Sequence, residues 1–149
     1  MKFFKKSKVY ANDPWAYKDC TEGYSSEDKN YQWWNQINLE DIYNQFKIML
    51  KNYDLTPYCI IIRSTSEACV NNFQDESIDI LHIDGNHSED FALRDAMLYF
   101  PKVKKNGYIW FDDVNWTSTS KAINYLKEHC TLNLKYSIGN DCYLFQRAN

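Results

Sequence analysis

Acidic residues stand at the end of three apolar segments of the chain. They are Asp13 after residues 8–11, Asp84 after residues 78–83, and Asp112 with Asp113 after residues 108–111. If these segments are parallel strands, their carboxyl ends share one edge of a sheet, where ligands bind in open α/β folds. Carboxylates brought together repel one another unless a cation or a proton neutralises them, and Mg²⁺ prefers oxygen ligands. Asp84, Asp112 and Asp113 therefore suggest a Mg²⁺ site, although strand-end acids also commonly cap the helices that follow.

Histidine supplies a second chemical group near this edge. His87 lies three residues after Asp84, at the start of the next expected helix, where it could take a proton from a bound substrate. The simpler interpretation is an exposed histidine at a helix start. His82 lies inside an apolar run and is expected to be a core residue, and His129 is expected to interact with the dipole at a helix end.

The segment from Asp84 to His87 contains the Gly-Asn-His sequence of binuclear metallophosphoesterases. Such sites resemble a set of several histidine and aspartate motifs along the chain. Only His82 and His129 remain to supply them, so the sequence argues against this function.

Hydrophobic periodicity predicts strands alternating with helices. Strands are expected at 8–11, 58–62, 78–83, 108–111, 132–137 and 142–146, with the second buried on both faces, and helices at 38–52, 66–73, 88–100 and 118–129. Asn38 and Ser88 are expected to cap the first and the third of these helices, and Met97 to lie on or near the buried side of the third. Turns are expected at residues 106–107 and 139–140. This alternation predicts an α/β fold with a mainly parallel sheet and a C-terminal antiparallel hairpin. Residues 16–34 are polar and aromatic without clear periodicity, which predicts a long surface loop. Loops of this length are commonly functional lids or mobile, and the aromatic residues here could cover a substrate or simply pack together.

Length and composition bound the class of protein. The chain has 149 residues, which predicts a single domain over 1–149. Its net charge of -3 gives no field that attracts nucleic acid, and no apolar run is long enough to span a membrane. Five cysteines without a C-x-x-C pair or a signal peptide predict reduced thiols in the cytoplasm. Four scattered glycines exclude a G-x-G-x-x-G loop.

Three segments resemble one family. Residues 78–114 read IDILHIDGNHSEDFALRDAMLYFPKVKKNGYIWFDDV, residues 9–15 read VYANDPW, and residues 61–68 read IIRSTSEA. Together they closely resemble the class I S-adenosylmethionine-dependent methyltransferases, in the branch of small-molecule and sugar O-methyltransferases. The resemblance implies a Rossmann-like three-layer fold, with residues 16–34 as a lid over a small-molecule hydroxyl acceptor.

The resemblance also assigns roles residue by residue. It implies that Asp13 binds the cofactor ribose, that Thr65 and Ser66 lie beside the adenine, and that Trp15 lines the same pocket, with Asp84 also on the cofactor side. Asp84, Asp112 and Asp113 fall where metal-dependent members hold Mg²⁺, and His87 falls on the position of the catalytic base.

One part of the family pattern has no counterpart in the sequence. The first βα unit, with its glycine-rich cofactor loop, should precede residues 8–11, and only residues 1–7 stand there. Three explanations are open: a fragment, a chain that oligomerises to cover the missing central strand, or a relative that no longer methylates. The two expected functions are a Mg²⁺-dependent O-methyltransferase and a catalytically inactive module that binds a ligand or assembles with itself.

Overall fold

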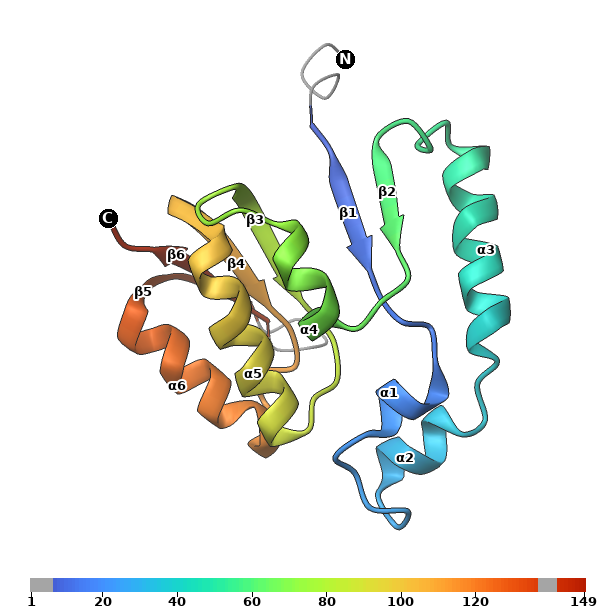
Figure 1. Ribbon diagram of the computed structural model, residues 1–149. Coiled ribbons are helices and arrows are strands. Elements are labelled where there is room, and N and C mark those ends of the chain that lie inside the picture. Colours follow the sequence, from blue (N-terminus) through green and yellow to red (C-terminus); the bar gives the residue numbers. More distant parts are fainter. Residues whose placement is uncertain (1–6, 137–141) are drawn as a thin grey trace. The chain divides into compact units, whose positions relative to one another are not determined.

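The structure is a computed structural model that describes residues 7–136 and 142–149 (Figure 1). The chain packs as two compact units. The N-terminal unit comprises the described residues up to Thr21 together with 25–69, and the C-terminal unit comprises Glu22–Tyr24 and Val70–Asn149. The single domain over residues 1–149 stays a prediction.

Two parallel strands form the sheet of the N-terminal unit (Figure 1). They are β1 (Val9–Asn12) and β2 (Cys59–Ile62). Both strands were predicted, but the expected burial of the second on both faces is wrong, since Ile60 is 41% exposed. The faces of a parallel sheet are buried only where helices cover them.

Four helices belong to the N-terminal unit: α1 (Tyr17–Thr21), α2 (Lys29–Trp34), α3 (Leu39–Asn52) and α4 (Ser66–Cys69). The prediction of α3 is confirmed with its cap, because the Asn38 side chain accepts a hydrogen bond of 3.1 Å from the Asp41 amide. The prediction that residues 16–34 form only a loop is wrong. Helices α1 and α2 are too short to show a repeating apolar pattern, so periodicity missed them.

A four-stranded mixed sheet forms the C-terminal unit. Its order is β3 (Ile78–Ile83), β4 (Val103–Phe111), β6 (Cys142–Arg147) and β5 (Cys130–Tyr136). Strands β3 and β4 are parallel, whereas β6 pairs antiparallel with both β4 and β5. The predicted α/β class with a closing antiparallel hairpin is confirmed. The predicted turn at residues 139–140 and the basic residues before residue 7 lie outside the described residues.

Helices α5 (Glu89–Tyr99) and α6 (Ser120–His129) pack on this sheet, with short 3₁₀ turns η1 (Val70–Asn72), η2 (Phe100–Lys102) and η3 (Thr117–Thr119) beside them. The fully buried core includes Val103, Ile109, Phe111, Leu126 and Phe145. On α5 the predicted buried face is only partly right. Ala92 and Ala96 are buried and Met97 is 49% exposed, because small residues let α5 approach its neighbours closely.

Two further differences from prediction concern the strands. Strand β4 continues through Asn106 and Gly107 instead of beginning after a turn there, and the register between β3 and β4 shifts at this point. His82 is exposed, so its expected place in the core is wrong. It lies on the same sheet face as Ile80, which is 67% exposed, opposite to the face that carries buried Ile83.

None of the helices in the described part of the chain is long and apolar enough to cross a membrane.

Candidate functional site

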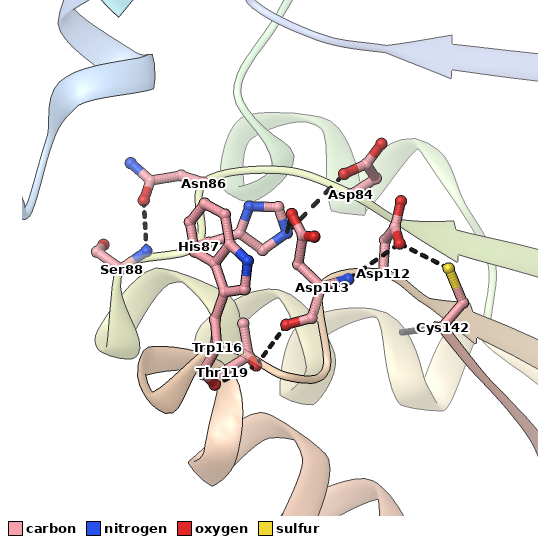
Figure 2. Close-up of polar contacts among 9 residues, drawn as sticks. All are labelled: Asp84, Asn86, His87, Ser88, Asp112, Asp113, Trp116, Thr119 and Cys142. Carbon is pink, nitrogen blue, oxygen red and sulfur yellow. Dashed lines mark hydrogen bonds and ion pairs between the residues drawn. The ribbon is translucent and has the colours of Figure 1, made fainter. Parts of the chain in front are cut away.

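The carboxyl ends of β3 and β4 bring the predicted acids of the C-terminal unit together (Figure 2). The two strands are in parallel register up to the pair Ile83 and Phe111. One residue further, the Asp112 amide donates a hydrogen bond of 3.1 Å to the Ile83 carbonyl. Asp84 and Asp112 therefore follow neighbouring strands at the same edge, as the sequence predicted.

His87 lies against this edge and is largely enclosed. Its side chain is 13% exposed, and its Nε2 is 3.9 Å from Asp84 Oδ1 and 3.7 Å from Asp113 Oδ2. No hydrogen bond satisfies this buried nitrogen. The Trp116 ring packs against the imidazole at 5.2 Å between centroids (Figure 2). The nitrogen thus lies beside two carboxylates and makes no hydrogen bond.

A tight loop between β3 and α5 positions His87. The Asn86 side chain accepts a hydrogen bond of 2.8 Å from the Ser88 amide and donates one of 2.8 Å to the Glu22 carbonyl. Ser88 was predicted to cap α5, but its side chain makes no cap hydrogen bond; its hydroxyl lies 3.4 Å from the Glu22 carbonyl. The segment around Glu22 therefore fixes the loop that carries His87.

The loop after β4 separates the two consecutive aspartates. Asp113 has a φ of 51°, in the left-handed region that aspartate tolerates better than most residues. Asp112 Oδ1 accepts hydrogen bonds from the Asp113 amide at 3.0 Å and from the Cys142 thiol at 2.6 Å. The Thr119 hydroxyl donates to the Asp113 carbonyl at 3.0 Å (Figure 2). These contacts direct the Asp113 carboxylate toward His87.

The ionised forms of these carboxylates are unfavourable unless a positive charge lies nearby. Burial raises the pKa of the Asp84 carboxyl above its ordinary value, and the negative charge of Asp112 raises it further, whereas His87 and His82 lower it. Burial is also the main cause that raises the pKa of Asp113, opposed by His87. A bound cation would relieve this repulsion.

Two sets of side chains in the described residues have ligand atoms close enough to share one metal ion. They are His82 with Asp84 and Asp112, and Asp84 with His87 and Asp113, with all ligand atoms of a set within 4.8 Å of one another. Asp84 belongs to both sets. Asp112 and Asp113, expected to bind one ion together with Asp84, fall into different sets because they point in different directions after β4. Their roles as metal ligands stay a prediction.

Asp13 and Trp15 belong to the N-terminal unit, after β1. Asp13 Oδ1 accepts a hydrogen bond of 2.5 Å from the Trp15 amide, and burial raises the pKa of its carboxyl. Trp15 has a φ of 43° and is 9% exposed, with its ring packed against Tyr43 and Phe46. Trp15 is thus a core residue of its unit, which leaves little of its ring available to line a pocket.

Thr65 and Ser66 start helix α4 after β2. Thr65 Oγ1 accepts a hydrogen bond of 3.3 Å from the Ala68 amide, so the hydroxyl caps the helix. Ser66 is the first helical residue. Asp13 and these two residues follow adjacent parallel strands, which is the arrangement that the sequence predicted for them, and their contact with a cofactor stays a prediction.

Comparison with protein families identifies the class. A family described as "Methyltransferase domain" matches residues 3–114, the greater part of the chain. The chain belongs to this family, and its fold is that of the class I S-adenosylmethionine-dependent methyltransferases.

Solved structures are similar in fold over nearly the whole chain. The O-methyltransferase NovP matches with a TM-score of 0.69 at 18% identity, covering 97% of this chain and 62% of NovP. A Corynebacterium glutamicum protein matches with a TM-score of 0.60 at 10% identity, covering 95% of this chain and 61% of its own. An O-methyltransferase family protein from Burkholderia thailandensis has a TM-score of 0.55 at 9% identity, with coverages of 99% and 53%. The chain thus spans between half and two thirds of these proteins.

A curated relative from Sinorhizobium fredii, uncharacterized protein y4gI, is 27% identical over 74 residues. The match covers 50% of this chain and 8% of that protein. This match assigns no activity to the chain.

Sequence reasoning missed three residues of the site. Trp116 packs on His87, the Cys142 thiol donates to Asp112, and exposed His82 lies beside Asp84. The spacing of Trp116, three residues after Asp113, could have indicated it. No local signal links Cys142 to Asp112, because the contact depends on the antiparallel pairing of β6 with β4.

Proposed function

We propose that this chain performs S-adenosylmethionine-dependent O-methylation of a hydroxyl on a small molecule or sugar, with Mg²⁺ at the acidic edge. One observation carries the proposal. In a chain of the methyltransferase-domain family, the ends of β3 and β4 bring Asp84 and Asp113 beside the enclosed Nε2 of His87, with Asp112 next to Asp84. O-methyltransferases among the structures of similar fold favour oxygen as the acceptor atom.

The residues at this edge suit a divalent cation. Hard cations take carboxylate oxygens, and the pKa values of Asp84 and Asp113 are raised where their charges are desolvated. Asp84 would hold the ion together with Asp112 or with Asp113, the acids of the two sets that share it. When bound, it would lower the pKa of a hydroxyl as a Lewis acid, and S-adenosylmethionine would supply the methyl group.

The chain's own contribution is to position the acceptor and to take its proton. His87 Nε2 is the proton acceptor, because it is the nitrogen that lacks a hydrogen-bond partner and faces the acidic edge. Trp116 packs against the imidazole and covers part of it. A base held in this way accelerates proton transfer by about 10²–10⁴-fold.

Residues 16–34 are proposed to cover the acceptor. Their aromatic side chains pair with one another, Tyr17 with Tyr31 at 5.9 Å and Trp33 with Trp34 at 4.7 Å between centroids. Trp33 remains 56% exposed.

Methyl transfer to a panel of acceptors tests the proposal. The chain is incubated with S-adenosylmethionine, Mg²⁺ and individual catechols and sugars, and S-adenosylhomocysteine is measured by mass spectrometry. We expect turnover with at least one acceptor, and a loss of about 10²-fold or more in His87→Gln. His129→Gln is the matched control, because His129 lies at the end of α6 and bonds the Tyr125 carbonyl. Equal rates in His87→Gln and wild type would exclude His87 as the base.

Mg²⁺ binding is tested apart from turnover. Titration calorimetry with Mg²⁺ should show binding to the wild type and none to the Asp84→Ala/Asp112→Ala double variant. Unchanged Mg²⁺ affinity in the double variant would refute the assignment of these ligands.

A second candidate function is a catalytically inactive module that assembles with itself. It is favoured by the exposure of Ile80 at 67% and Trp110 at 38% on one face of the β3 to β6 sheet, and by the position of β3 at the end of the strand order. Light scattering should then give the molar mass of a homo-oligomer for the wild type and that of a monomer for Ile80→Lys. A monomeric wild type would exclude self-assembly.

A further inference from the structure

His82 is presented at the acidic edge by the strand itself. It lies on β3 two residues before Asp84, which directly follows the strand, and the ligand atoms of the two side chains lie within 4.8 Å of each other. The backbone partner of His82 on β4 is Trp110, whose ring meets the imidazole edge to face at 6.4 Å between centroids. The imidazole is exposed, so its nitrogens are open to an ion from solvent.

Asp112 completes a set of three donors with His82 and Asp84. Their ligand atoms lie within 4.8 Å of one another, and all three come from the adjacent ends of β3 and β4. The hydrogen bond from the Asp112 amide to the Ile83 carbonyl fixes the relative position of the two strand ends. One nitrogen from β3 and two oxygens from the residues that follow β3 and β4 thus converge.

The mixture of donors distinguishes between metal ions. Mg²⁺ is bound by oxygen ligands and water, whereas imidazole suits divalent transition ions. We propose that this edge binds a divalent transition ion, for which Mn²⁺ serves as the probe, in preference to Mg²⁺, with His82, Asp84 and Asp112 as its protein ligands. The proposal rests on the proposed metal site, in which it replaces the ion and adds His82, but it does not require methyl transfer.

The second set of donors supports a nitrogen-ligated ion at this place. His87 also directs an imidazole nitrogen toward Asp84, and that nitrogen is buried without a hydrogen bond. The edge therefore offers one imidazole in each of the two donor sets that share Asp84. His82 is assigned as the ligand because its strand position is fixed by the sheet, while His87 stays available as the base.

Manganese titration with pulsed electron paramagnetic resonance tests the proposal on the intact chain. The chain has three histidines, so a ¹⁴N coupling on bound Mn²⁺ can be assigned by substitution. We expect Mn²⁺ to bind the wild type about tenfold or more tightly than Mg²⁺, with imidazole ¹⁴N coupling. His82→Gln should remove this coupling and lower Mn²⁺ affinity about tenfold, while Mg²⁺ affinity changes less than about twofold.

His87→Gln is the comparison variant. It should keep the ¹⁴N coupling, because His82 is the proposed ligand. Coupling that is lost in His87→Gln and kept in His82→Gln would overturn the assignment, as would Mn²⁺ binding without any ¹⁴N coupling. Because His82 is exposed, its variant should unfold at the wild-type temperature, which circular dichroism checks.

The outcome separates this inference from the proposed function. Imidazole-ligated Mn²⁺ without methyl transfer to any acceptor supports the inference and contradicts the function. Methyl transfer with Mg²⁺ and no imidazole coupling to Mn²⁺ supports the function and contradicts the inference.

Discussion

At the scale of single residues, the backbone and the surroundings of Asp113 both disfavour an ionised aspartate. Its φ of 51° lies in the left-handed region, where asparagine is tolerated best after glycine. Its carboxyl is 17% exposed, and burial raises its pKa. The aspartate therefore lowers stability in the metal-free protein, and its charge is expected to be retained for the ion or the proton transfer.

Asp113→Asn should stabilise the metal-free protein at pH 7. A raised pKa means that the folded state binds the proton more readily than the unfolded state, so the ionised carboxylate opposes folding above the folded pKa. The variant should therefore have a higher free energy of unfolding than the wild type, and the difference should be full at pH 7. The difference should decrease as the pH falls through the folded-state pKa and vanish below about pH 4, near the ordinary pKa of aspartate. Urea unfolding from pH 3 to pH 8 measures it, and we expect about 1 kcal/mol.

Asp54→Asn is the matched control, because Asp54 is exposed and also has a positive φ, of 55°. It reports the backbone preference alone. A gain in Asp113→Asn that is equal at pH 3 and pH 7 would show that the carboxylate charge is not its cause.

Residue types and spacing predicted part of this site. The sequence placed Asp84 and Asp112 at one sheet edge because each directly follows a strand, and His87 near them because it lies three residues after Asp84. The structure brings these residues together. The direction of Asp113 could not be predicted, because it depends on a positive φ and on the bond from Thr119. His82 was misjudged because an apolar run does not reveal that one sheet face stays open.

At the scale of elements, the loop before α5 depends on a close backbone approach at Gly23. Its φ is 84°, and a Cβ there would lie 2.5 Å from Ser88 Oγ. Gly23→Ala should destabilise the protein by about 1–3 kcal/mol, because it adds both backbone strain and a clash. Thermal unfolding followed by circular dichroism measures the loss.

Gly85→Ala serves as the control in the same loop. A Cβ at Gly85 would meet only Asp95 Oδ2, at 3.4 Å. Its unfolding temperature should fall much less than that of Gly23→Ala. Equal losses would show that the contact of Gly23 with Ser88 does not hold the loop.

Helix α5 offers a test of the face that the structure buries. Ala96 is fully buried, so Ala96→Met should cost about 1–3 kcal/mol through overpacking. Met97→Ala, at the next position, should change the free energy of unfolding by less than about 0.5 kcal/mol because Met97 is half exposed. A larger loss in Met97→Ala than in Ala96→Met would contradict the observed face.

The presence of a helix or strand was easier to predict than which of its faces is buried. The cap at Asn38 and the long apolar pattern after it predicted α3 to within a residue. On α5, Ala92 and Ala96 are buried and Phe100 packs against the core, whereas Met97 is exposed, so hydrophobicity alone placed Met97 wrongly. Asn106 and Gly107 carry a turn signal, yet pairing with β3 draws them into β4 with a shifted register.

At the scale of the whole molecule, the predicted α/β methyltransferase fold is confirmed, and the chain spans about 60% of NovP and of the Corynebacterium protein. The residues proposed for cofactor binding and for chemistry fall in different compact units. Asp13, Thr65 and Ser66 belong to the N-terminal unit, and His87 with its acids belongs to the C-terminal unit. Cofactor binding by this chain is therefore the central question about its function.

Titration calorimetry with S-adenosylmethionine answers it most directly. We predict saturable binding to the wild-type chain and a loss of about 10–100-fold in affinity in Asp13→Ala, the cost of hydrogen bonds to a charged group. Asp19→Ala, which removes a nearby carboxylate on α1, should bind like the wild type. A folded wild-type chain that binds no S-adenosylmethionine, or an Asp13→Ala variant that binds it equally well, would contradict the account.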